Sequence, residues 1–260
     1  MTEKIPPEHL LQWYISAGVD ETIGDLAVNH FEQRPETPRV SRQKPQNDPV
    51  LFQSAPQKSD VLLTTTKTLS LAKQASSLQE LKEIIADFDE CPLKKTATNM
   101  VFGAGNPQAQ LMIIGEAPGA QEDLQGQPFV GPSGHLLDLM LHSVGLDRTE
   151  VYISNILPWR PPANRKPSES EIALFTPFIR RHIALIKPKV LLLLGGSAVS
   201  ALMQTNAGIT KIRGRWLTYT DEELTIDAIA SFHPAFLLRT PAQKKLSWRD
   251  FLAVKKRLTA

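Results

Sequence analysis

The chain has 260 residues, of which 42% are hydrophobic, and it carries a net charge of +2 at pH 7. This length can bury one large core or two small ones, and the composition is ordinary for a globular protein. No apolar run approaches the roughly 18 residues that span a bilayer, and the first residues lack a signal-peptide pattern. We therefore expect no membrane association and a cytoplasmic location, in the bacterial cytoplasm or nucleoid.

The small net charge excludes attraction of nucleic acid by bulk electrostatics, so any DNA-binding charge must be local. Solvated helix ends would explain each local cluster of basic residues equally well. The candidate clusters are Arg160, Arg165 and Lys166, then Lys211, Arg213 and Arg215, and then Arg239, Lys244 and Lys245.

The first part of the chain differs in composition from the rest. Residues 1–33 predict a helical segment, with the apolar residues Leu10, Leu11, Tyr14 and Ile15 on one face. Residues 34–68 are polar and rich in proline, which indicates a flexible linker. We expect the compact domain at residues 69–260, with Ser77 capping a helix over 78–88. The N-terminal helix suits docking on a repair or replication partner, or packing on its own domain.

The stretch after the first predicted strand, residues 111–114, is unusual. It reads GEAPG over residues 115–119, then QPFVGPSGHLL over residues 127–137, and leads into a predicted helix over 135–144. A passage from strand to loop to helix leaves backbone N–H groups unpaired at the helix start, which favours anionic or nucleotide ligands.

Apolar runs and helical patterns alternate along the remaining sequence. Strands are predicted at residues 151–154, 190–194 and 226–232, and helices at 169–186, 197–203 and 243–258. Alternation of this kind is typical of an α/β fold with a mostly parallel sheet. In such sheets ligands bind beyond the carboxyl ends of the strands, and here those ends deliver Glu116, Asn155, Ser197 and His233.

Each of these residues alone has a structural explanation. Glu116 suits a solvated loop carboxylate, Asn155 a turn, and His233 a loop position before proline, while Phe129 suits the core. In combination and in this order, GEAPG, VYISN, RPPANR, LLGGSA and SFHPAFLLR resemble the motifs of the family 4 uracil-DNA glycosylases. The resemblance covers roughly residues 88–256. It implies a three-layer α/β/α fold and a monomer that hydrolytically removes uracil from single- or double-stranded DNA in base excision repair.

The chemistry of that reaction suggests roles for the unusual residues. Phe129 offers an aromatic face for a flipped base, and the amide of Asn155 matches O4 and N3–H of uracil but not cytosine. His233 would stabilise the uracil anion, and Glu116 would position water or stabilise the sugar cation. The resemblance adds Asn164 as a secondary active-site residue.

The loop that begins at Gly115 would line the uracil pocket together with Ala117. In commoner uracil-DNA glycosylases an aspartate stands at the position of Ala117, so the usual water-activating carboxylate is missing. No lysine is placed by a motif as an amine nucleophile, so we expect a monofunctional enzyme. The candidates for contact with DNA are helix starts, cations and an apolar wedge: Ser133, Gly134, Arg165, Ser197, Leu237, Leu238 and Arg239. Core packing of one or both of Leu237 and Leu238 would explain these residues equally well.

The sequence departs from the family at the four cysteines that hold an iron–sulfur cluster. Alignment of the motifs puts Phe88, Cys91, Trp159 and Phe175 at those positions. A single thiol cannot hold such a cluster, and it excludes an intramolecular disulfide framework. We therefore predict no iron–sulfur cluster and no other metal, with the aromatic side chains filling the cluster's volume.

Two alternatives keep the same fold. A non-catalytic adaptor would recognise uracil-containing or abasic DNA. Ala117 in place of the aspartate and the absent cluster leave this alternative open, whereas the presence of Glu116, Asn155 and His233 argues against it. A glycosylase for another damaged base, such as hypoxanthine or xanthine, is disfavoured by Asn155.

Overall fold

A six-stranded sheet organises the domain, in the strand order β1-β3-β2-β4-β6-β5. The computed structural model describes residues 58–203, 205, 207–222 and 224–259. The central pairs β2–β3, β2–β4 and β4–β6 are parallel, and the outer strands β1 and β5 pair antiparallel. The predicted mostly parallel sheet is confirmed. Its strands are β1 (Ala104–Gly105), β2 (Leu111–Gly115), β3 (Val151–Asn155), β4 (Val190–Leu194), β5 (Trp216–Asp221) and β6 (Leu224–Ser231).

The central strands are apolar throughout because both faces of the sheet are covered. Side chains alternate between the faces along each strand. In β2, Leu111 and Ile113 belong to one hydrophobic core, whereas Met112 and Ile114 belong to the other. The apolar runs seen in the sequence are therefore the centres of two separate cores.

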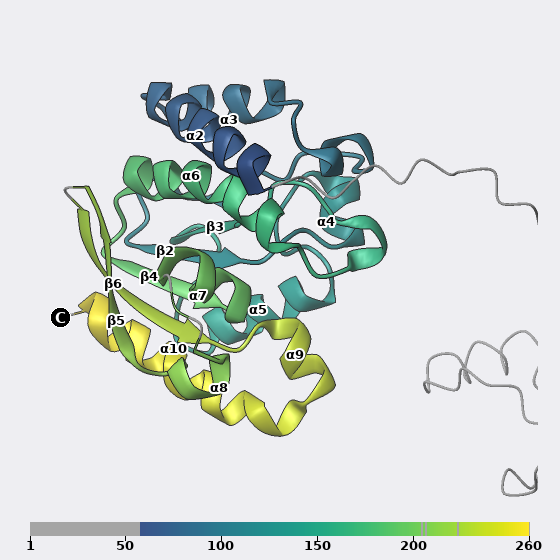
Figure 1. Ribbon diagram of the computed structural model, residues 1–260. Helices are drawn as coiled ribbons and strands as arrows, with labels where there is room; N and C mark the ends of the chain where they lie inside the picture. The colour runs from purple at the N-terminus through teal and green to yellow at the C-terminus, as the bar shows by residue number, and fades with distance from the viewer. Residues whose placement is uncertain (1–57, 204, 206, 223, 260) are drawn as a thin grey trace, which may run out of the picture. The chain divides into compact units, whose positions relative to one another are not determined.

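Helices form a layer on each side of this sheet (Figure 1). Helices α2 (Lys58–Gln74), α3 (Leu78–Asp87), α6 (Glu169–Ile186) and α7 (Gly196–Met203) lie over one face. Helices α5 (Pro132–His142) and α10 (Lys244–Thr259) lie over the other. The three-layer α/β/α arrangement is thus confirmed. The shorter helical elements are α4 (Ala120–Gln125), α8 (Ile209–Ile212), α9 (Pro234–Arg239), and the 3₁₀ helices η1 (Pro92–Lys95), η2 (Pro162–Asn164) and η3 (Pro241–Gln243).

Capping residues fix the starts of two helices in the α2–α6 layer. The Ser77 side chain accepts a hydrogen bond from the backbone N–H of Glu80, as predicted for the start of α3. Ser168 and Glu171 form a capping box at the start of α6. Both caps satisfy backbone N–H groups that a helix start otherwise leaves unpaired.

The N-terminal boundary of the folded domain lies earlier than the composition indicated. All described residues belong to one compact unit, Ser54–Ala260, and α2 begins at Lys58. Residues 58–68 are therefore helix rather than part of the predicted linker. The small side chains of Thr68 and Ala72 are buried on this helix, which packs on α6. Because Thr68 and Ala72 are short side chains, they contribute little to an apolar pattern in the sequence.

The other N-terminal predictions fall outside the described residues. These are the helical segment at residues 1–33 and the linker over residues 34–57. Among the helices that the structure describes, none is long and apolar enough to cross a membrane.

Candidate active site

A cavity of about 600 Å³ opens beyond the carboxyl ends of β2, β3 and β6. It is where the parallel sheet was expected to bind a ligand. The sequence-predicted residues that line it are Glu116, Ala117, Phe129, Ser133, Asn155, Asn164, Arg165, His233 and Arg239.

Phe129 forms an aromatic wall of this cavity in an unusual backbone conformation. Its φ is 55°, and its ring stacks on that of His233 with centroids 5.5 Å apart. Gly134 is required beside it, because a Cβ there would lie 1.7 Å from the Phe129 carbonyl oxygen. Arg148 donates hydrogen bonds to the carbonyl oxygens of Phe129 and Pro128. The ring is therefore held by its backbone as well as by its neighbours.

Asn155 carries the most unusual polar atom of the cavity. Its side chain is 5% exposed, and Oδ1 has no hydrogen-bond partner within the described part of the chain. Leaving a buried acceptor unpaired costs about 1–3 kcal/mol, so a ligand N–H at this point would bind favourably. Gly115 pairs with Asn155 in the parallel register. A Cβ on Gly115 would lie 2.4 Å from Asn155 Oδ1 and 2.7 Å from the Phe129 ring.

His233 is held as a neutral hydrogen-bond donor. Burial, with a smaller contribution from the positive charge of Arg239, lowers the pKa of His233 to about 4. Its Nδ1 accepts a hydrogen bond from the backbone N–H of Ala235 at the start of α9. Because Nδ1 accepts, the proton of the neutral ring resides on Nε2. The ring therefore offers an N–H donor without a positive charge.

Glu122 ties together the two loops that frame the cavity. Its carboxylate accepts hydrogen bonds from the backbone N–H groups of Gly119 at 3.1 Å, Val130 at 2.9 Å and Gly131 at 2.7 Å. One buried side chain thus links the loop before α4 to the loop that carries Phe129. Glu122 lies between the GEAPG and QPFVGPSGHLL motifs, and the sequence analysis assigned it no role because only the folded chain brings these N–H groups together.

The loop after β3 supplies Asn164 and Arg165 in a fixed arrangement. Asn164 has φ 53°, and its Oδ1 accepts a hydrogen bond from Arg160 Nε at 2.7 Å. Arg165 binds the Glu171 carboxylate through two hydrogen bonds of 2.6 and 2.9 Å. Both residues lie at the cavity, but the Arg165 charge is already paired with Glu171.

The predicted DNA-contacting residues do not all share this cavity. Ser197 lines a second cavity of about 1020 Å³, which includes the start of α6. Lys166 lines both cavities, so the two adjoin. Ser133 and Arg239 lie at the first cavity, and Gly134 is buried beside it.

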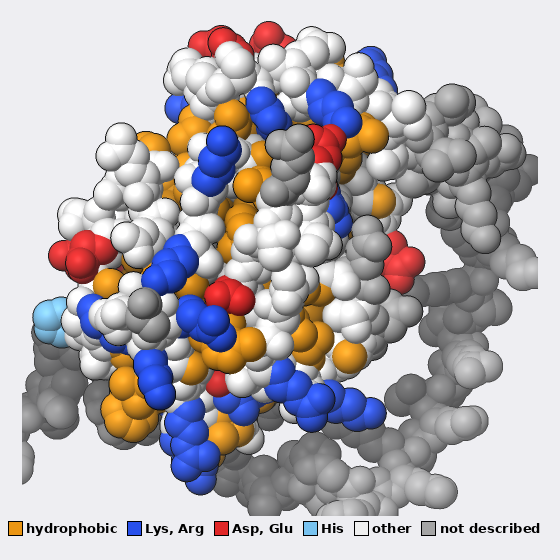
Figure 2. Space-filling model, turned by 90° about the vertical axis from the view of Figure 1, so that its left-hand side faces the viewer, with side chains coloured by type: hydrophobic (Ala, Val, Ile, Leu, Met, Phe, Trp, Pro, Cys, Tyr) orange, Lys and Arg blue, Asp and Glu red, His pale blue; other side chains and the backbone are white. Residues whose placement is uncertain are grey.

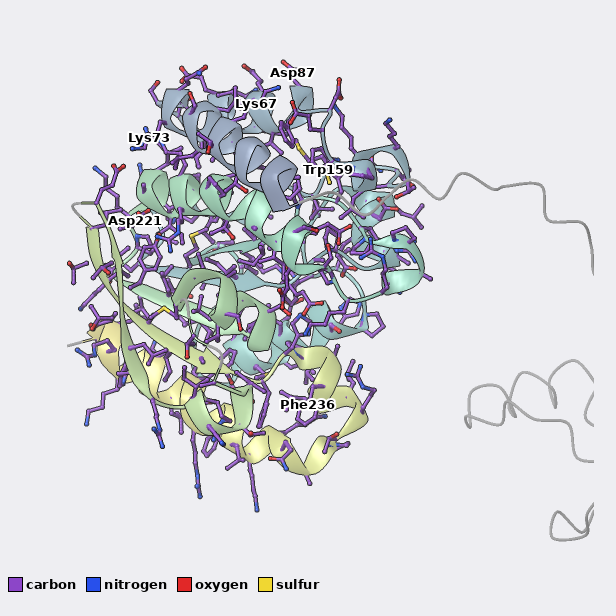
Figure 3. The ribbon with its side chains drawn as sticks, in the orientation of Figure 1. Lys67, Lys73, Asp87, Trp159, Asp221 and Phe236 are labelled. Carbon is purple, nitrogen blue, oxygen red and sulfur yellow. The ribbon has the colours of Figure 1, made fainter. Side chains whose placement is uncertain are left out.

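The predicted wedge of two leucines is corrected by the structure. Leu237 has 0% exposure, because it lies on the inner face of α9 together with Pro234, three positions earlier. It therefore packs in the core, and Leu238, which is 42% exposed, remains the candidate wedge. Phe236, which the sequence analysis did not single out, lines the cavity, and Figure 3 shows it on α9. Its position beside the leucines in α9 was the available signal.

The sequence is similar to those of known proteins over the region that forms this cavity. Residues 102–253 match the sequence model of the Uracil DNA glycosylase superfamily. The chain belongs to this superfamily. It is 38% identical over 184 residues to the "Type-4 uracil-DNA glycosylase" of Sulfurisphaera tokodaii, covering 69% of this chain and 84% of that protein. It is 37% identical to the protein of that name from Archaeoglobus fulgidus, with 67% and 90% covered. These relatives place it in family 4, as the motifs indicated.

The four positions that align with the iron–sulfur cysteines of family 4 carry three aromatic residues and one cysteine in this protein, here called the aromatic group. Phe88, Cys91, Trp159 and Phe175 are all buried in the core that contains α3 and α6. The rings of Phe88 and Phe175 lie edge to face with centroids 6.1 Å apart, and those of Trp159 and Phe175 are 5.4 Å apart. Figure 3 shows Trp159 on this side of the sheet, away from Phe236.

The donor atoms at these positions do not fit a four-cysteine cluster. The aromatic side chains of Phe88, Trp159 and Phe175 have no sulfur to offer, and burial raises the pKa of the Cys91 thiol, which disfavours the ligating thiolate. Within the described ranges there is no group of three or more His, Cys, Asp and Glu residues that could hold a metal ion.

Proposed function

We propose that this protein is a monofunctional glycosylase that removes uracil from DNA by hydrolysis and leaves an abasic site. The buried Oδ1 of Asn155, which has no partner among the residues that the structure describes, carries the proposal. Uracil presents an N3–H donor and an O4 acceptor, which match the Oδ1 acceptor and the Nδ2 donor of one amide. Cytosine presents the opposite pattern at these atoms, and it would leave Oδ1 without a donor. The site thus favours uracil over cytosine.

The remaining cavity residues supply what bond cleavage requires. Water adds to C1′ of the deoxyribose as the bond from C1′ to N1 breaks, and the electron pair of that bond leaves with the base. The neutral His233 would donate from Nε2 to uracil O2, where negative charge develops. Phe129 would hold the extruded base, which costs a few kcal/mol to unstack.

Glu116 and Asn164 are the candidates for the sugar side of the reaction. Both line the cavity, and Ala117 has no carboxylate with which to activate water. We propose that Glu116 positions the water and accepts its proton or stabilises the cationic sugar, with Asn164 assisting. Catalysis would then depend mainly on stabilisation of the leaving base.

DNA would reach the cavity along its rim. Ser133 and the Gly134 backbone at the start of α5 (Pro132–His142), together with Arg239, would contact phosphates close to the extruded nucleotide. Leu238 would enter the gap in the duplex. Ser197 would bind a phosphate further along the strand, at the adjoining cavity, and Arg165 would contribute when a phosphate competes with Glu171.

We also propose that the enzyme works without an iron–sulfur cluster. The support is the chemistry of the cluster positions, where aromatic packing replaces thiolate ligands. Iron analysis and an absorption spectrum of the purified protein test this. We expect less than stoichiometric iron and no band near roughly 400 nm, the region in which such clusters absorb. Stoichiometric iron would overturn the proposal.

The oligomeric state, the cellular location and the role of the N-terminal segment are also proposals. We propose a monomer acting on single- or double-stranded DNA in the cytoplasm, with the domain preceded by a Pro-rich linker and an N-terminal helical segment. That segment would bind a repair or replication partner. Deletion of residues 1–57 should abolish such binding and spare excision, whereas unchanged partner binding would contradict it.

Excision from an oligonucleotide with a single uracil tests the function. The native protein should release uracil, and Asn155→Asp and His233→Ala should each lower kcat/KM about 10²–10³-fold, as expected for loss of one preorganised hydrogen bond in a closed site. His135→Ala, a change of an exposed histidine on α5, is the matched control and should keep full activity. Tight binding to the same DNA without release would favour the adaptor instead.

A further inference from the structure

One face of α10 is exposed and carries cations around an aromatic side chain. The exposed positions recur with helical spacing, and Trp248 and Leu252 among them are 50% and 40% exposed. The opposite face, including Phe251 and Val254, packs against the sheet. The exposed residues of the helix, apart from Thr259 at its end, are Lys244, Lys245, Trp248, Arg249, Leu252 and Lys256.

Among the described residues, no acid forms an ion pair with the cations at the start of this face. Asp250 is the one acidic residue of α10, and it is buried against Arg213 and Ser231. None of the ion pairs formed between described residues uses Lys244, Lys245 or Arg249. Figure 2 shows Lys and Arg side chains gathered with hydrophobic ones over the lower part of its face, where Figure 1 places α10. Such a surface suits a polyanion that also offers apolar faces.

This cationic face begins at the rim of the candidate active site. Arg239 lines the cavity at the end of α9, and η3 joins it to Lys244 at the start of α10. Contacts of η3 with both α9 and α10 keep these elements together. Trp248 lies one helical turn beyond Lys244, about 6 Å along the axis at 1.5 Å per residue.

We propose that the first two turns of α10 bind the DNA strand that flanks the target nucleotide. Lys244, Lys245 and Arg249 would neutralise phosphates, and Trp248 would pack against a deoxyribose or an unpaired base. This inference rests on the proposed function. It adds the start of α10 to the DNA-binding surface at the cavity rim, so that the protein also contacts the DNA beside the target nucleotide. Continuity with the cavity and the excess of positive charge favour DNA over an acidic protein as the occupant.

Salt-dependent binding to DNA without uracil tests the surface independently of catalysis. Lys244→Gln/Lys245→Gln should weaken binding and lower the slope of log K against log salt by about 1.8, because each phosphate neutralised on duplex DNA adds about 0.9 to that slope. Lys82→Gln/Lys95→Gln removes two exposed lysines on the α3 side of the sheet and is the matched control. An unchanged slope in the first variant would overturn the proposal, even if uracil release is normal.

Trp248 provides a direct optical test. Its fluorescence should be quenched when the same DNA binds, and Trp248→Phe should abolish that change. Trp216→Phe is the control. The Trp216 ring packs against Arg257, whose Cζ lies 4.6 Å from the ring centroid, and we expect its fluorescence not to respond to DNA. Quenching that persists in Trp248→Phe and disappears in Trp216→Phe would contradict the proposal. Failure of uracil release with normal quenching would instead overturn the proposed function and keep the DNA surface.

Discussion

The candidate active site and the aromatic group lie in the same domain but differ in their side chains: the first is lined by polar groups, and the second is closely packed and apolar. The cavity has polar side chains, a buried amide oxygen with no partner in the described part of the chain, and Phe129 and Asn164 at positive φ. The aromatic group has no ligating set and is closely packed, with Phe175 only 1% exposed. Backbone strain and an unmet hydrogen bond thus occur where a ligand would bind, whereas packing dominates in the aromatic group. The two regions should therefore respond differently to substitution.

The largest effect is expected from loss of an aromatic ring. Phe175→Ala should lower the free energy of unfolding by about 3–5 kcal/mol, because it removes buried packing and leaves a cavity. Phe175→Leu, which keeps more volume, should cost less. Denaturant unfolding measures both, and uracil excision by the folded fraction should be unchanged. A large loss of kcat in folded Phe175→Leu would show that the two regions are coupled.

A single methyl group at the cavity should have a functional effect instead. Gly134→Ala places a Cβ where the Phe129 carbonyl oxygen lies, so Phe129 must move. Because a displacement of about 1 Å in an active site can lower the rate about 10²-fold, we expect a loss of that order in kcat/KM. Gly196→Ala is the matched control, since its Cβ would have nothing within 4 Å. Equal activity of the two variants would contradict the role of Phe129.

Acid should destabilise the domain through two histidines, the buried His182 on α6 and His233 at the cavity. Burial lowers the pKa of His182 to about 3 and that of His233 to about 4. The unfolded chain takes up protons at its ordinary pKa near 6.5, so stability is complete above that pH and falls as the pH drops toward the folded values. Between pH 7.5 and 5 each histidine should contribute a loss of about 2 kcal/mol.

Urea unfolding at these two pH values measures this loss. His182→Gln should remove about half of the pH dependence, although it also removes the hydrogen bond to the Tyr152 hydroxyl, 2.9 Å from Nε2. A pH dependence unchanged by His182→Gln would show that His182 is protonated in the folded protein.

The smallest effect is expected at the exposed tip of α9. Leu238→Ala should leave stability within about 0.5 kcal/mol, as for most surface substitutions, and raise KM for duplex DNA more than for single-stranded DNA. Leu237→Ala should instead lower stability by about 2–5 kcal/mol, because Leu237 is buried. Thermal unfolding and excision assays separate them. Equal KM on the two DNA forms in Leu238→Ala would exclude a wedge.

Sequence reasoning was strongest where local pattern and fold agree. The central strands and the helix over residues 169–186 were predicted because apolar runs and helical periodicity determine them locally. The four strand-end residues were also placed at the same edge, and Glu116, Asn155 and His233 do line one cavity.

Other features depend on tertiary interactions that no local pattern reveals. The antiparallel edge strand β5 (Trp216–Asp221) mixes polar and apolar residues, with Tyr219 its one buried position. Glu122 acquires its role from N–H groups of three other residues, brought near by two loops. Leu237 and Leu238 are identical neighbours in the sequence, and only the direction of α9 separates core from surface.

The central claim is that the cavity removes uracil while the aromatic group takes the place of an iron–sulfur cluster. Measuring uracil release and iron content on the same protein preparation tests it most directly. We predict full release by preparations that contain essentially no iron. Release that rises in proportion to bound iron, or no release by iron-free folded protein, would contradict it.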